Sequence, residues 1–472
     1  MKKTYGVCLG LLALGFVGLG APASRAHERL ATDEAGNGSE MSATSTANST
    51  SSATASSPAD LRQRIDALKA ELADLNAQLA SEKDSEQGAP ATAQEQASPT
   101  LSASAAAPVT TPPAPMPLTT PAMSAPLSTA VPHEISAGPF GKVQVTGILS
   151  GLGWSEGNYV AGDTPTHWDL ANAQAFVQKT TGVVQFYLQA GTYNIPALAT
   201  PFTPTGETTK DVFGPFPTGY VKLVKGNFNV EVGELPTLIG AEYTFDFENM
   251  NIERGLLWNQ ENAINRGIQL NETYKKLTLA LSWNDGFFSN RYTWLTGSLA
   301  YAINASNTLT FVGGGNAGVY GKNTLATPLY LNNSDIYNLI YSYTKGNWMI
   351  MPYFQYTDVP KNAKIGILEG ASTRGGAILA NYNFKHGISF AVRPEYIAAS
   401  GKVGSSNTNL LFGPGSGGFS FTLTPTYVKD AFFLRGDFSI VHATNSTPGD
   451  AFGTNGLKVN QPRGAIEAGF MF

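Results

Sequence analysis

The chain has 472 residues, including 50 glycines, 25 phenylalanines and 19 tyrosines, and only 14% of its residues are charged. Its formal net charge of −5 leaves no basic footprint for nucleic acid, which we therefore exclude as a partner. After the amino-terminal segment, no stretch approaches the ~18 consecutive apolar residues of a membrane helix. A membrane protein without such helices must close its backbone hydrogen bonds in a barrel, because lipid offers no partner to an open sheet edge.

The first 26 residues have the layout of a secretory signal peptide. Two lysines precede an apolar run from Val7 to Leu19, and small residues follow up to Ala26. The only cysteine, Cys8, lies inside this run. The exported chain is therefore predicted to contain no thiol and no disulfide.

Three segments of different composition follow. Residues 27–59 are mostly Ser, Thr, Ala and Asn, which offer too few large apolar groups to offset the entropy of ordering, so they are predicted to be disordered. Residues 60–82 are predicted to form a helix with an apolar heptad seam. Residues 83–138 are rich in Pro, Ala, Ser and Thr, which predicts an extended linker.

The seam of the predicted helix recurs in alternating steps of four and three residues. Its members are Leu61, Ile65, Leu68, Leu72, Leu75 and Leu79. A helix this short is only marginally stable alone, so the seam predicts a coiled coil between protomers. The alternative is a single amphipathic helix lying on another surface, and the seam leaves the oligomer order open.

From residue 139 onward, apolar and polar side chains alternate with a period of two. In the segment from Val184 to Ala190, polar Gln185 and Gln189 alternate with apolar Phe186 and Leu188. One face toward lipid and the other toward water is typical of transmembrane β-strands. A soluble sandwich also alternates, but its turns are short at both ends.

The connections between these segments alternate in length. Seven tight ones lie near residues 179–182, 225–227, 274–276, 304–307, 345–347, 385–387 and 429–430. Longer loops, rich in Gly and Asn, lie between them at residues 192–217, 235–265, 317–334, 401–416 and 445–460. This pattern predicts an all-β fold, a transmembrane antiparallel β-barrel of about 16 strands, with short turns in the periplasm and long loops outside the cell.

Two stretches of this region resemble the OmpL-like β-barrel porin-2 family. They are LPTLIGAEYTFDFENMNIERGLLWNQENAINRGIQL at residues 235–270 and WNDGFFSNRYTWLTGSLAYAINASNTLTFVGGGN at residues 283–316. The likeness covers most of residues 139–472, and the helix ahead of it resembles that of the trimeric DcaP-like porins. These resemblances imply the outer membrane of a Gram-negative bacterium, a periplasmic amino-terminal segment and a homotrimer.

One set of charged side chains falls on the strand face opposite the apolar one. A lysine or arginine on the lipid face would cost ~2–4 kcal/mol at mid-membrane, so parity and energetics both place this set in the lumen. We predict a water-filled pore lined by Lys142, Lys222, Glu231, Arg393, Glu395, Arg435, Asp437, Arg463 and Glu467. The alternative is a salt-bridged plug, although an interior of about 16 strands is too wide for side chains alone to fill.

The longest insertion, residues 242–266, mixes apolar residues with charges. Long loops with structure of their own are usually functional, so we predict that it folds into the barrel mouth as a constriction. Its apolar residues should face the wall and its charges the channel; these charges are Glu242, Asp246, Glu248, Glu253, Arg254, Glu261 and Arg266. Five acids against two arginines predict a weak cation preference. The alternative is an exposed extracellular loop.

The sequence offers no pairing of nucleophile and base, and no metal ligands at regular spacing. We therefore expect no enzyme activity, cofactor or metal. The sequence favours an outer-membrane porin for passive diffusion of small hydrophilic solutes or ions, with membrane lipid and further copies of the chain as partners. The competing hypothesis is a structural envelope tether, whose barrel is an anchor and whose coiled coil and linker engage the periplasm or the cell wall.

Overall fold

The computed structural model describes Leu127, residues 133–160 and residues 162–472. The predicted signal peptide, disordered segment, coiled-coil helix and most of the predicted linker lie outside these residues. No helix in the described part of the chain is long and apolar enough to cross a membrane.

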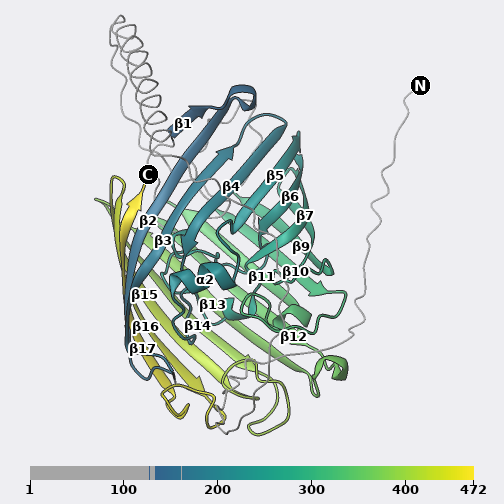
Figure 1. Cartoon of the computed structure of the whole chain (residues 1–472), viewed down its shortest axis with the longest axis vertical. Helices are drawn as coiled ribbons and strands as arrows, with labels where there is room; N and C mark the ends of the chain where they lie inside the picture. Colours follow the sequence, from purple (N-terminus) through teal and green to yellow (C-terminus); the bar gives the residue numbers. More distant parts are fainter. Residues whose placement is uncertain (1–126, 128–132, 161) are drawn as a thin grey trace, which may run out of the picture. The chain divides into compact units, whose positions relative to one another are not determined.

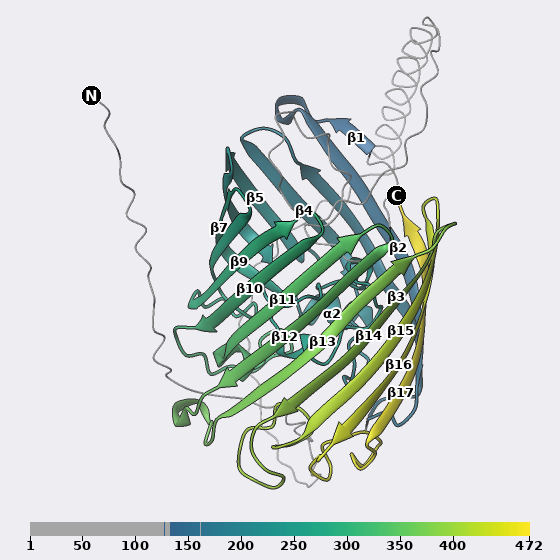
Figure 2. The same ribbon diagram turned by 180° about the vertical axis from the view of Figure 1, so that it is seen from behind.

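Sixteen antiparallel strands form a closed barrel (Figures 1 and 2). Each strand pairs with the next one in the chain, and the last pairs with the first, so no edge is left open. The strands are β2 (Lys142–Glu156), β3 (Thr166–Lys179), β4 (Val184–Tyr193), β5 (Thr218–Lys225), β6 (Phe228–Pro236), β7 (Ile264–Tyr274), β8 (Leu277–Asn284), β9 (Trp294–Asn304), β10 (Asn307–Asn316), β11 (Asp335–Lys345), β12 (Trp348–Val359), β13 (Ala371–Asn383), β14 (Ile388–Ala399), β15 (Gly417–Lys429), β16 (Phe432–Thr444) and β17 (Asn460–Met471). The predicted barrel of about 16 strands is confirmed.

The connections differ in length at the two ends of the barrel. All seven tight turns lie where the sequence predicts them, at the upper end in Figure 1, which we call the turn end. The longer connections gather at the other end, the loop end, and one contains the helix α2 (Thr205–Asp211). Short 3-10 helices, η2 (Asp246–Glu248), η3 (Trp258–Gln260), η4 (Leu331–Asn333) and η5 (Ala363–Ile365), occur in other loops.

The outer face of the wall is apolar, because side chains alternate between the two faces of each strand. In β15, Phe419 and Phe421 are 44% and 41% exposed, whereas Ser420 and Thr422 between and beyond them are fully buried. Exposed aromatic side chains stand near the turn end at Phe228, Tyr274, Trp348, Phe384 and Tyr427. This arrangement is typical of a lipid-facing barrel with an interfacial aromatic girdle.

A short additional strand, β1 (His133–Ser136), precedes the barrel and is joined to it through η1 (Gly138–Phe140). Residues 133–136 were predicted to be part of the linker, but they pair with the first four residues of β2. The final residue, Phe472, exchanges backbone hydrogen bonds with Gly147 in both directions. Strands β17 and β1 therefore pair with consecutive stretches of the same edge of β2, and together they close the barrel.

Candidate functional site

The connection between β6 and β7, residues 237–263, folds into the barrel and is here called the internal loop. Its ends are already paired, since the Thr237 N–H donates to the Ala263 carbonyl at 2.9 Å. Several of its large apolar side chains are at most 2% exposed, among them Phe245, Phe247, Met250, Ile252, Leu256 and Leu257. They pack with inward-facing apolar residues of the wall, among them Ile148, Leu152, Trp154 and Phe176. The internal loop thus has a hydrophobic core with the wall.

A second loop, residues 194–217, contributes to the same interior. The Leu198 N–H donates to the Arg254 carbonyl at 2.9 Å, and the Arg254 N–H donates to the Pro196 carbonyl at 3.0 Å. Both views of the chain place α2, which belongs to this loop, within the ring of strands (Figures 1 and 2). The two loops therefore form one layer inside the barrel.

Strand β14 binds the internal loop through two neighbouring inward-facing charges. Arg393 forms an ion pair with Glu242 and donates to the Glu253 carbonyl at 2.7 Å. Glu395 accepts from the N–H groups of Leu256 and Leu257, at 2.7 Å each. The wall therefore recognises main-chain groups of the loop as well as a loop carboxylate.

Strand β16 makes a second set of contacts with the loop. Arg435 donates to the carbonyls of Asp246 at 3.0 Å and Asn249 at 2.8 Å. Two residues further along, Asp437 accepts from the Ile252 N–H at 2.9 Å. As in β14, an arginine takes carbonyl oxygens and a carboxylate takes amide hydrogens, which satisfies loop groups that water cannot reach.

Strand β17 completes the network through Arg463. This guanidinium pairs with Glu253 of the internal loop at 2.8 Å and with Glu156 of β2, and it donates to the Ala197 carbonyl of the second loop at 2.9 Å. It also lies over the Trp154 ring, 4.3 Å from the ring centre. One arginine thus joins both loops to the closing strands of the barrel.

Burial changes the protonation behaviour of the loop groups. Burial raises the pKa of Glu242, while the Arg393 guanidinium opposes this change by favouring the ionised carboxylate. Burial lowers the pKa of Arg254 to about 10, although the carboxylates of Asp246, Glu242 and Glu248 oppose that change. Burial raises the pKa of Glu261 well above its ordinary value, the nearby carboxylates of Glu242 and Glu395 raise it further, and no cation opposes this change. Glu242 is therefore electrostatically compensated by a nearby arginine, whereas Glu261 is not.

Six predicted pore-lining residues face inward as expected but do not face open water. Arg393, Glu395, Arg435, Asp437, Arg463 and Glu467 are 0–5% exposed beneath the loops. The predicted orientation of the loop charges is also wrong, because Glu242 and Glu253 face arginines of the wall and not the channel. Alternation along a strand predicts which face a side chain occupies, but not what covers that face.

Two further predictions need correction at the barrel ends. Lys142 is exposed at the first residue of β2 and pairs with Glu134 of β1 at 2.7 Å, so it does not line the interior. Arg266 belongs to β7 and not to the loop, and it pairs with Asp285 at 2.9 Å. Strand parity placed Lys142 in the lumen but could not show that β1 pairs beside it at the end of the barrel. Arg266 was assigned to the loop because β7 begins two residues before it, inside the predicted insertion.

The other two predicted lining residues lie on the inner wall where the loops do not cover it fully. Lys222 of β5 and Glu231 of β6 pair at 2.9 Å, and the Lys222 side chain is 30% exposed. Amide side chains of β7 and β6 continue the row, since Gln269 donates to Asn271, which donates to Asn229. We call this row the polar strip, and it consists of Lys222, Asn229, Glu231, Gln269 and Asn271. Lys222, Asn229 and Asn271 are partly exposed, whereas Glu231 and Gln269 are 9% and 8% exposed.

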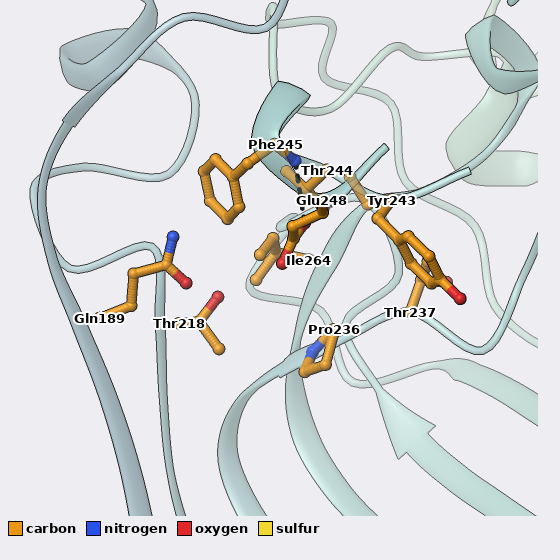
Figure 3. A pocket seen from close by; sticks show the side chains of 10 residues that line it. Gln189, Thr218, Pro236, Thr237, Tyr243, Thr244, Phe245, Glu248 and Ile264 are labelled. Carbon is orange, nitrogen blue, oxygen red and sulfur yellow. Dashed lines mark hydrogen bonds between the residues drawn. The ribbon is translucent and has the colours of Figure 1, made fainter. Parts of the chain in front are cut away.

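The internal loop also closes against the wall formed by β4 and β5 (Figure 3). Gln189 and Thr218 project from the wall toward Phe245 of the loop. The space between them is about 20 Å³, which is room for about one water molecule.

Sequence reasoning missed Glu156, which completes the Arg463 site, and the inward-facing apolar residues beside it. Leu152 and Trp154 share its strand face and are 2% and 3% exposed. An apolar residue on the polar face of a strand was the available signal, because such a residue needs a partner inside the barrel. Among the described residues, no group of three or more His, Cys, Asp or Glu is arranged to hold a metal ion.

The family model described as "Putative beta-barrel porin-2, OmpL-like" matches residues 143–472. The chain belongs to this family. No curated protein matches the chain. Among solved structures, OmpT of Vibrio cholerae is 12% identical with a TM-score of 0.48, covering 72% of this chain and all of that one. The anion-selective porin from Comamonas acidovorans is 12% identical, with a TM-score of 0.46 and coverage of 70% and 99%. The channel DcaP of Acinetobacter baumannii is 9% identical, with a TM-score of 0.45 and coverage of 70% and 97%.

Family membership and the closed barrel together identify the protein as an outer-membrane porin with a channel role.

The ion pair between Arg393 and Glu242 should be necessary for docking of the internal loop. Replacing Arg393 with Met leaves Glu242 buried without its ion-pair partner, which should lower the free energy of unfolding by ~3–5 kcal/mol. The double variant R393M/E242Q should recover a large part of this loss, because the side chain at position 242 is then neutral. Thermal and urea unfolding in detergent would measure both effects. Arg374→Met, at an exposed arginine of the adjacent strand β13, is the matched control and should change little; equal losses at positions 374 and 393 would contradict the docking role.

Proposed function

We propose that small hydrophilic solutes and ions cross this porin by passive diffusion, along a path that the internal loop narrows. The supporting observation is the reach of that loop. It leaves the wall between β6 and β7 and is bound by β14, which lies half-way around the ring of sixteen strands. A barrel of about 16 strands is too wide for wall side chains alone to fill, so a loop across the lumen controls its free width.

The polar strip offers the inner surface along which this path would run. Its amides and its Lys222–Glu231 pair present donors and acceptors that can replace part of the hydration shell of a solute. On the side of β14, β16 and β17, by contrast, the wall is covered by the loops. Solutes would therefore pass the strip and not the buried arginines.

Removing the internal loop should widen the path. Because Thr237 and Ala263 are already hydrogen-bonded, a short Gly/Ser turn can replace residues 238–262 without opening the barrel. We expect the single-channel conductance in planar bilayers to rise severalfold. Shortening the exposed loop tip at residues 402–406 is the control and should leave conductance unchanged. Equal conductance with and without the internal loop would place it outside the path, and a parent protein that forms no ion steps would favour the envelope tether.

The charges of the polar strip should set the sign of ion preference, and two matched variants test this. Glu231→Gln leaves Lys222 unpaired in the lumen and should shift the zero-current potential under a salt gradient toward anion preference. Lys222→Gln leaves Glu231 unpaired and should shift it toward cation preference. Both shifts should be largest at low salt, where the screening length is ~30 Å at 0.01 M. Shifts of the same sign, or none, would show that ions do not pass this strip.

We further propose that the protein is a homo-oligomer, specifically a trimer, and that the predicted coiled coil at residues 60–82 joins its protomers in the periplasm. The double variant L68D/L72D places charge in the seam and should lower the temperature at which oligomers dissociate in detergent. A70D/A77D, on the opposite face of the predicted helix, is the control. Oligomers of L68D/L72D that resist heat as well as the parent would exclude the seam from assembly.

A further inference from the structure

Buried carboxylates outnumber buried arginines where the loops meet the wall. Nine acids and four arginines are at most 9% exposed there: Glu156, Glu242, Asp246, Glu248, Glu253, Glu261, Glu395, Asp437 and Glu467, with Arg254, Arg393, Arg435 and Arg463. Excess charge of one sign is unfavourable in a medium of low dielectric constant, because each ion loses hydration without gaining a counter-charge. Bound protons or bound cations must offset this excess.

Among these acids, Glu261 is the one whose carboxylate receives the fewest hydrogen bonds from the protein. It is 6% exposed, and neither of its carboxylate oxygens has a hydrogen-bond partner among the described residues. Its neighbours differ, since Glu242 pairs with Arg393 and Glu395 accepts two backbone N–H groups. A buried, ionised carboxylate without donors is strongly destabilising unless something outside the protein binds it.

A glycine allows this carboxylate to sit where it does. A Cβ on Gly240 would lie 1.8 Å from the Glu261 Oε2 atom, and Gly240 has φ of +84°, a conformation that favours glycine. The Gly240 N–H donates to Asn338 of β11 at 3.1 Å, and therefore not to Glu261. The Glu261 carboxylate thus contacts the backbone at Gly240 but accepts no hydrogen bond from the Gly240 N–H.

A second group without a partner lies nearby on the wall. Tyr353 of β12 is 4% exposed, and its hydroxyl has no hydrogen-bond partner among the described residues. On β12 it lies two residues along the same inner face from Gln355, which is opposite Asn338 of β11. Asn338 in turn accepts from the N–H of Gly240, the residue against which the Glu261 carboxylate lies. A loop carboxylate and a wall hydroxyl, both buried and both unpartnered, therefore face the same region.

We propose that a monovalent cation of the Na⁺ or K⁺ class binds between the Glu261 carboxylate and the Tyr353 hydroxyl and joins the internal loop to β12. Oxygen ligands suit hard cations. A single charge matches a single unpartnered carboxylate, and the described residues form no group of three acids that would hold a divalent ion. The site goes beyond the proposed diffusion path, because the ion stabilises the loop whether or not solutes cross the barrel.

Thermal unfolding of the full-length oligomer tests the proposal without any transport assay. At pH 8, the melting temperature should rise with NaCl or KCl concentration by about 2–4 °C relative to choline chloride of equal ionic strength. Choline screens charge equally but is too large for a buried site. Glu261→Gln should abolish this difference between salts, and Tyr353→Phe should reduce it while keeping the charge of Glu261. Glu369→Gln, at an exposed acid, should retain it in full.

Two results would overturn the proposal. If Glu261 holds a proton in place of a cation, stability would be greatest at low pH and fall as pH rises through its raised pKa, with no difference between sodium and choline.

Crystals soaked in thallium(I) give a second readout that does not depend on folding energy. An anomalous peak beside Glu261, absent in Glu261→Gln, is expected, whereas no peak at that carboxylate in the parent protein would exclude a cation there.

Discussion

Three buried arginines, Arg393, Arg435 and Arg463, hold the interior of this barrel together. Each binds a carboxylate and also a main-chain carbonyl of a loop. A guanidinium group suits this task because it carries five donors in a planar fork and stays charged when buried. The cost of removing these charges from water is offset only while the loop acceptors are present. The loops and this part of the wall therefore stabilise each other.

This dependence divides the inner wall into two regions with different chemistry. Around β14, β16 and β17 the charges are satisfied by loop groups, so they contribute to the fold more than to contact with solutes. Along β5, β6 and β7, Lys222 pairs with Glu231 and stays partly exposed. Charged residues of the same strand parity thus have unlike roles, and burial by the loops decides which role each one has.

The sequence predicts the barrel well because its signals are local. A period of two and the turn residues depend on neighbours a few positions apart, so strand number and every tight turn follow from them. The site depends on contacts that sequence distance hides: Arg393 and Glu242 are 151 positions apart, and Arg463 and Glu156 are 307 apart. Parity correctly placed Arg393 on the inner face. It could not reveal Glu242 as its partner, because that contact exists only once the loop has crossed the lumen.

The junction where β17 and β1 pair with β2 has a consequence for how the chain can be cut and joined. Phe472 lies opposite Gly147, and His133 of β1 lies opposite Val145, in the same row along β2. Only the place opposite Thr146 separates the carboxyl terminus from β1. A tag fused after Phe472 would collide with β1 and compete for the edge of β2. Conversely, a single inserted residue would link Phe472 to His133 as one continuous strand, which makes this seam the natural junction for a circularly permuted barrel with new ends in a distant loop.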